Sequence, residues 1–174
     1  PAADRLVALT NAITDITSTL MGDYKLNQVL IMMLEAFYRS MGFQRVLLCV
    51  RDARSGEVSA RFGFGEGVDE LIPRFRFTPG AGGDVFSSAM QQGRDCIILD
   101  VPGDNGRHVI PAWCRKLAAP HALTLFPIIT GGRAIACVYA DSQARAARIS
   151  AEELRLVKAL VNQGALAVRN ARQR

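Results

Sequence analysis

The feature that most constrains the fold is a pair of apolar segments, Ala122–Thr130 and Arg133–Asp141, which are separated only by Gly131 and Gly132. Glycine readily adopts the positive φ angles that a two-residue turn between antiparallel strands requires. Each segment is long enough to form one strand of a sheet. The pair therefore predicts a tight β-hairpin, and with it an antiparallel sheet.

Shorter segments of strand character extend this sheet. Arg45–Arg51 and Glu57–Phe64 flank the turn Asp52–Gly56, which predicts a second hairpin. Charged residues alternate with phenylalanines over Arg74–Thr78, as expected of a half-buried edge strand, and Cys96–Val101 is a short apolar strand. The sequence thus predicts about six strands.

Three longer segments have helical periodicity. Apolar residues form a narrow seam in the first, a stripe on one side of the second (Lys25–Met41, closed by Gly42), and two neighbouring stripes in the third. Ser150 and Glu153 form a capping box that starts the third helix, which we expect to run to about Arg172. The apolar residues of the first and third helices that we expect to form helix–helix contacts, including a dimer interface, are Leu6, Leu9, Ile13, Ile16, Leu20, Leu154, Val157, Val161 and Val168.

Short helices are predicted between the strands. Asp84 is a suitable N-cap for a helix over Val85–Gln92, and Ile110–Ala118 has room for another before Pro120. A further short helix is expected within 66–75, whereas Pro102–His108 has the composition of a loop. The fold class is therefore α+β, with the terminal helices packed together on one face of the sheet and short helices and loops over the other.

Length and charge limit the possible functions. The 174 residues suit one domain that can bury its own core. No apolar run reaches the roughly 18–20 residues that a membrane span needs. Basic side chains exceed acidic ones by 21 to 16, but without interleaved aromatic residues, so nucleic-acid binding is not predicted. We expect a cytoplasmic protein and, because the chain begins with Pro1, a piece of a longer one.

Side chains that could carry chemistry are few. The four cysteines, Cys49, Cys96, Cys114 and Cys137, form no Cys-x-x-Cys pair, which favours reduced thiols. His108, Cys114 and His121 have no spacing typical of metal ligands, so no metal site is predicted. Catalytic motifs are lacking as well, and no catalytic residue is assigned. A redox pair of Cys96 and Cys114 remains an alternative.

The sequence favours a ligand pocket as the functional site. Trp113 is the single tryptophan, and it acts either as a plug that closes the sheet or as one wall of a pocket near residues 100–126. A pocket would also need polar side chains and a covering loop. The candidate lining residues are Phe64, Asp100, Trp113, Cys114, His121, Thr124, Phe126 and Arg133.

From about Leu26 to Ala171 the chain resembles a GAF domain. The resemblance rests on the helix Leu26–Met41 and the strand Arg45–Arg51, on the glycine turn and short helix of Gly80–Gly93, and on Cys96–Asp100. It continues through the hairpin that ends at Asp141 and the closing helix. Residues 1–24 would then form a signalling or dimerisation helix ahead of a GAF-like domain over 25–174.

The resemblance implies a sensory or regulatory module of a larger bacterial signalling protein, dimeric through its terminal helices and linked to an output domain. The motifs of the family's known ligands are missing. The Asn-Lys…Phe-x-x-x-Asp-Glu signature of cyclic-nucleotide binding is absent, and Cys114 is followed by Arg115 instead of the histidine of bilin-binding relatives. The ligand therefore stays unidentified, and no tightly bound cofactor is expected. The alternatives are a ligand-free dimerisation module and a cysteine-based redox sensor or reductase.

Overall fold

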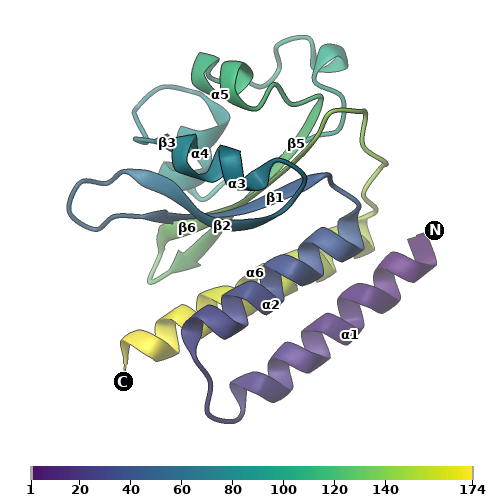
Figure 1. Ribbon diagram of the computed structural model, residues 1–174, viewed down its shortest axis with the longest axis vertical. Helices are drawn as coiled ribbons and strands as arrows, with labels where there is room; N and C mark the ends of the chain where they lie inside the picture. The colour runs from purple at the N-terminus through teal and green to yellow at the C-terminus, as the bar shows by residue number, and fades with distance from the viewer. Residues whose placement is uncertain (1, 174) are drawn as a thin grey trace. The chain divides into compact units, whose positions relative to one another are not determined.

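The computed structural model describes residues 2–173, which fall into two compact units. One unit holds the helices before residue 43 and after residue 148, and the other is the sheet domain Phe43–Arg148. Each unit is described by itself below, with the element labels of Figure 1.

The helical unit consists of α1 (Ala2–Leu20), α2 (Leu26–Met41) and α6 (Ala151–Arg172), and each helix packs against the other two. Figure 1 shows them lying side by side. The predicted boundaries are confirmed for α2 and α6. Gly42 ends α2 in the left-handed conformation with φ of 73°, and Ser150 and Glu153 form both hydrogen bonds of the capping box.

The apolar seam of α1 is used inside this unit. Leu9 and Ile16 are fully buried, whereas Leu6, Ile13 and Leu20 are half-buried. Polar contacts fix the same helix to α6, because Gln163 Nε2 donates to the carbonyl of Ile13 at 3.0 Å. The apolar seam of α1 therefore packs against α2 and α6 of the same chain.

The sheet domain contains six antiparallel strands in the order β3-β2-β1-β6-β5-β4. The central hairpin is confirmed: Thr130 pairs with Arg133 across the two glycines, both of which have positive φ. The predicted α+β class is confirmed. The strands are β1 (Arg45–Arg51), β2 (Val58–Gly65), β3 (Arg76–Phe77), β4 (Cys96–Ile98), β5 (Ala122–Thr130) and β6 (Arg133–Ser142).

Short helices lie over one face of this sheet (Figure 1). They are α3 (Val68–Leu71), α4 (Val85–Gln92) and α5 (Ala112–Leu117). The prediction for α4 is confirmed at both ends, since the Asp84 side chain accepts from the backbone N–H groups of Phe86 and Ser87, and Gly93 closes the helix with φ of 66°.

Two predictions were too long. The expected edge strand over 74–78 is only Arg76–Phe77, because the preceding 3-10 turn Ile72–Arg74 takes Arg74. The expected strand over 96–101 ends at Ile98, after which the chain turns into the 3-10 turn Pro102–Asp104, within the predicted loop. Both strands lie at the edges of the sheet, where only one neighbour is available to extend the pairing.

Candidate functional site

A cluster of five aromatic rings occupies the space between the sheet and the short helices. It consists of Phe75, Phe77, Phe86, Trp113 and Tyr139, which we call the aromatic cluster. Trp113 lies 4.8 Å from Phe86 and 5.2 Å from Phe75 between ring centroids, and it stacks on Phe77 at 5.4 Å. These are ordinary distances for attractive ring contacts.

Four different parts of the sheet domain supply these rings. Trp113 comes from α5, Phe86 from α4 and Tyr139 from β6, while Phe75 and Phe77 flank Arg76 at the start of the edge strand. Phe75 and Tyr139 are fully buried, and Trp113 is only partly buried. Trp113 therefore closes the cluster from outside, as in the plug interpretation of this residue.

Beneath the rings lies a buried polar network. Arg45 binds both carboxylate oxygens of Asp141, with Nε at 2.8 Å from Oδ1 and Nη2 at 2.7 Å from Oδ2. The Tyr139 hydroxyl donates to Asp141 Oδ2 at 2.6 Å. Arg45 Nη2 also donates to the carbonyl of Ala118 at 3.1 Å, which ties the chain after α5 to the sheet.

This network holds its groups in fixed protonation states. The hydrogen bond to Asp141 raises the pKa of Arg45 more than burial lowers it. Burial, and then the charge of Asp141, raise the pKa of the Tyr139 phenol well above its ordinary value. Tyr139 therefore stays protonated at neutral pH, and its hydroxyl donates a hydrogen bond to the Arg45–Asp141 ion pair. Such a network stabilises the fold and supplies no acid or base for catalysis.

Two of the predicted site residues join this region. Trp113 belongs to the aromatic cluster, and Cys114 is fully buried beside Tyr139 and Arg45. A second pair, Asp100 and His121, forms a separate contact of 2.9 Å between Oδ1 and Nε2. Both of those side chains are about one-third exposed, at 31% and 36%.

The structure does not bring the other predicted residues to the aromatic cluster. Leu125 pairs with Tyr139 on the cluster face of the sheet, so its neighbours Thr124 and Phe126 lie on the opposite face. Phe64 pairs with Val46 and shares that opposite face, because Val46 in turn pairs with Ala140, the partner of Thr124. Arg133 begins β6 at the hairpin turn, beside a different pocket. The expected lining therefore divides into separate places.

Sequence reasoning missed the roles of Arg45 and Asp141. The signal was present in β6, where Tyr139 and Asp141 are two residues apart and hence on one face of a strand. A buried tyrosine and carboxylate on the same face require polar partners. The partner could not be identified, because Arg45 is nearly 100 positions away in the sequence.

The cysteines are placed where thiols are unreactive. Burial raises the pKa of Cys96 and of Cys114 from 9.0 to about 12. Cys49 and Cys137 face each other across β1 and β6, and burial, with the neighbouring thiol, raises the pKa of Cys49 as well. The juxtaposed pair in the sheet is thus Cys49–Cys137, which sequence reasoning did not pair.

These raised pKa values predict slow alkylation and a loss of stability in alkali. The unfolded chain releases thiol protons from about pH 9.0, whereas the folded chain holds those of Cys96 and Cys114 until about pH 12. The unfolded state therefore binds fewer protons in that window, and the free energy of unfolding should fall as pH rises through it. Iodoacetamide labelling at pH 8 should need unfolding; fast labelling of the folded chain would contradict this assignment.

Metal and membrane sites find no support in residues 2–173. No group of three or more histidine, cysteine or acidic side chains is close enough there to hold an ion. Over the same residues, no helix combines the length and the apolar character needed to cross a bilayer.

Several solved structures share this architecture. The GAF domain of a phosphoenolpyruvate-protein phosphotransferase from Coxiella burnetii matches with a TM-score of 0.74 and 15% identity, over 97% of this chain and 96% of its own. Residues 122 to 287 of a methyl-accepting chemotaxis protein match with a TM-score of 0.73 and 17% identity, over 94% and 99%. The free methionine-R-sulfoxide reductase of Neisseria meningitidis, solved with its substrate, matches with a TM-score of 0.71 and 18% identity, over 95% and 90%.

The six-stranded antiparallel sheet, with short helices over one face, has the α+β fold of these solved domains. The family model of the GAF domain matches residues 25–169, and the chain belongs to the GAF domain family. No curated protein matches the sequence.

Proposed function

We propose that this chain is a non-catalytic regulatory GAF domain of a larger bacterial, cytoplasmic signalling protein, and that it works as a homodimer. One observation carries the proposal. The aromatic cluster fills the space over the sheet with the chain's own rings, and Trp113 closes it. A domain whose interior is already packed transmits a signal through the arrangement of its helices, on to a covalently linked output domain.

The positions of the thiols argue against the redox alternative. A cysteine that reacts with a sulfoxide or a disulfide needs a lowered pKa and access to solvent. Cys96 and Cys114 have neither, since burial raises the pKa of both to about 12. The substrate-bound reductase among the similar structures shares the fold at 18% identity, which supports no transfer of its activity.

Exposed apolar side chains on the helices support dimerisation. Val7 on α1, Ile31 on α2 and Leu166 on α6 are large apolar residues with 59%, 42% and 41% exposure. The predicted seam residues Leu9 and Ile16 are already buried in the chain, so the exposed residues are the better candidates for contact with a second copy.

The test is native mass spectrometry combined with size-exclusion chromatography and light scattering. We expect a dimer of twice 18.9 kDa with no additional mass. Leu166→Glu should shift the population to monomer by placing a charge in an apolar contact. Val109→Glu is the matched control, because Val109 is 56% exposed but belongs to the sheet domain. A monomer at high concentration, or equal effects of both substitutions, would refute the dimer.

A ligand-binding sensor is the second candidate, and the partial exposure of Trp113 favours it. Of the five clustered rings, Trp113 alone is not buried, and it lies on a helix of six residues. Displacement of so short a helix would open the cluster to an apolar ligand. A bound small molecule in the native mass spectrum, or absorbance beyond the aromatic band, would select this candidate over the self-filled module.

A further inference from the structure

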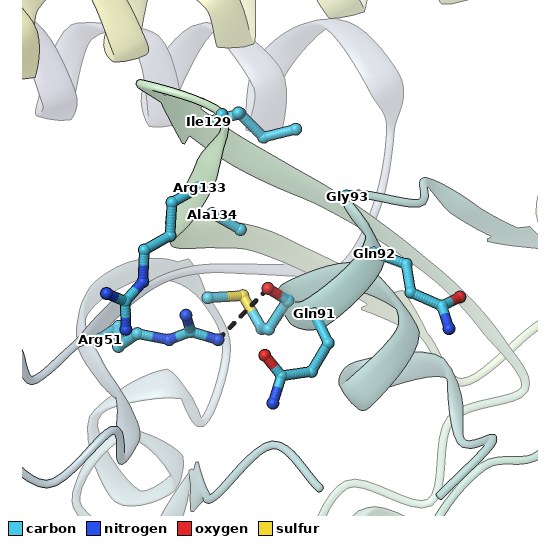
Figure 2. A pocket seen from close by; sticks show the side chains of 9 residues that line it. Arg51, Gln91, Gln92, Gly93, Ile129, Arg133 and Ala134 are labelled. Atoms are coloured by element: carbon cyan, nitrogen blue, oxygen red, sulfur yellow. Dashed lines mark hydrogen bonds between the residues drawn. The ribbon is translucent and has the colours of Figure 1, made fainter. Parts of the chain in front are cut away.

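A pocket of about 360 Å³ lies on the sheet domain away from the aromatic cluster. Its walls are the C-terminal end of α4, the last residue of β1 and the turn between β5 and β6. Figure 2 shows Arg51 and Arg133 on one side, with Gln91 and Gln92 from the end of α4 across from them. The pocket lining contains no acidic residue.

One hydrogen bond holds the Arg51 side chain in place, but another of its N–H groups has no acceptor. Its Nη2 donates to the carbonyl of Met90 at 3.2 Å, shown as the dashed line in Figure 2. Its Nε is buried and has no hydrogen-bond partner. Burial and the nearby charge of Arg133 lower the pKa of Arg51, so the two guanidinium groups repel each other.

The contrast with the other enclosed arginines is informative. Arg45 and Arg5 each have a carboxylate partner, Asp141 and Glu153 respectively. Among the described residues, neither Arg51 nor Arg133 takes part in an ion pair. Two arginines that line one pocket and have no carboxylate partner are the arrangement that an external anion would complete.

We propose that this pocket, which we call the two-arginine pocket, binds a small phosphate monoester through Arg51 and Arg133. A phosphate dianion carries two negative charges, which match the two guanidinium groups, and its oxygens can accept hydrogen bonds from the guanidinium N–H groups that face the pocket. A single carboxylate would neutralise only one of the two cations. The volume is at the lower end of the range for small-molecule sites, so it accommodates a phosphate with a small organic group.

The remaining walls suit the rest of such a ligand. Ile129 and Ala134 contribute apolar surface, and the Gln91 and Gln92 amides can both donate and accept hydrogen bonds. The main-chain acceptor at the end of α4 already receives a hydrogen bond from Arg51, which reduces the unfavourable effect of the helix C-terminus on an anion. The inference does not rest on the proposed regulatory function, since the aromatic cluster contributes nothing to this pocket.

Phosphate titration followed by NMR tests the proposal directly. Inorganic phosphate is added to the ¹⁵N-labelled chain at pH 8, where it is a dianion, at constant ionic strength set with sodium chloride. We expect saturable shifts at the Nε–H of Arg51 and the amide of Gly93, with dissociation constants of the order of millimolar. Arg133→Ala should weaken binding by about tenfold, the effect of one charge-assisted hydrogen bond.

The control removes the same charge elsewhere. Arg54 is exposed in the turn between β1 and β2 and does not line the pocket. Arg54→Ala should change the dissociation constant by less than about twofold, because solvent screens an exposed charge outside the pocket. Arg51→Met, with folding checked by circular dichroism, should abolish the shifts at Gly93. Equal weakening by Arg133→Ala and Arg54→Ala, or no saturation in the wild-type chain, would overturn the proposal.

Discussion

Replacing Asp141 with asparagine is expected to lower the free energy of unfolding by about 3–5 kcal/mol, the usual effect of breaking a buried ion pair on one side. Asp141 is fully buried and accepts from both Arg45 and Tyr139. The asparagine side chain has the shape of the Asp141 carboxylate but not its charge. The guanidinium of Arg45 is therefore left enclosed without a counterion. Its remaining bond, to the carbonyl of Ala118, cannot replace that charge.

Urea unfolding followed by circular dichroism measures this effect, with Glu35→Gln as the control. Glu35 pairs with Arg39 at 2.8 Å, but on the surface of α2, where such a pair contributes only about 0.3–0.5 kcal/mol. The double variant Arg45→Met with Asp141→Leu should regain part of the lost stability, because no charge then remains unpaired. Equal effects of Asp141→Asn and Glu35→Gln would show that the network adds nothing beyond a surface pair.

Trp113→Ala is expected to lower the free energy of unfolding by about 3–5 kcal/mol and to leave an apolar cavity. The indole contacts Phe75, Phe77 and Phe86, so its removal deprives three rings of a neighbour. Because the site is apolar, we expect free indole to enter the cavity and raise the melting temperature of the variant.

Thermal unfolding with and without indole is the measurement. Wild type should show no stabilisation by indole, since Trp113 already occupies the position. Tyr38→Ala, which removes a half-buried ring of the helical unit, serves as the control and should not respond to indole. Stabilisation of the wild type would instead indicate that the aromatic cluster opens to ligands. A much smaller loss of stability in Trp113→Ala would contradict the interpretation of Trp113 as a plug.

Local signals explain what could be predicted from sequence. The helix Val85–Gln92 was predicted at both ends because its start and stop depend on Asp84 and Gly93 alone. The capping box at Ser150 and the hairpin over Gly131 and Gly132 are likewise determined by adjacent residues. The edge strands were overestimated because strand length depends on neighbours that are distant in sequence.

The candidate site was less predictable for a physical reason. Every residue of Ala122–Ile128 is buried, so β5 lacks the alternation that shows which side chains share a face. Thr124 and Phe126 were therefore grouped with Trp113, although pairing places them on the other face. The two-arginine pocket was hidden for a different reason: Arg51 and Arg133 meet only when β1 and the central hairpin are assembled.

The two outermost strands of the sheet have only two and three residues. Each of these strands offers too few backbone donors and acceptors to pair with a long strand from another chain. The association between copies that we propose uses side chains of the helices. Surface substitutions can therefore alter its specificity and leave every backbone hydrogen bond of the sheet intact.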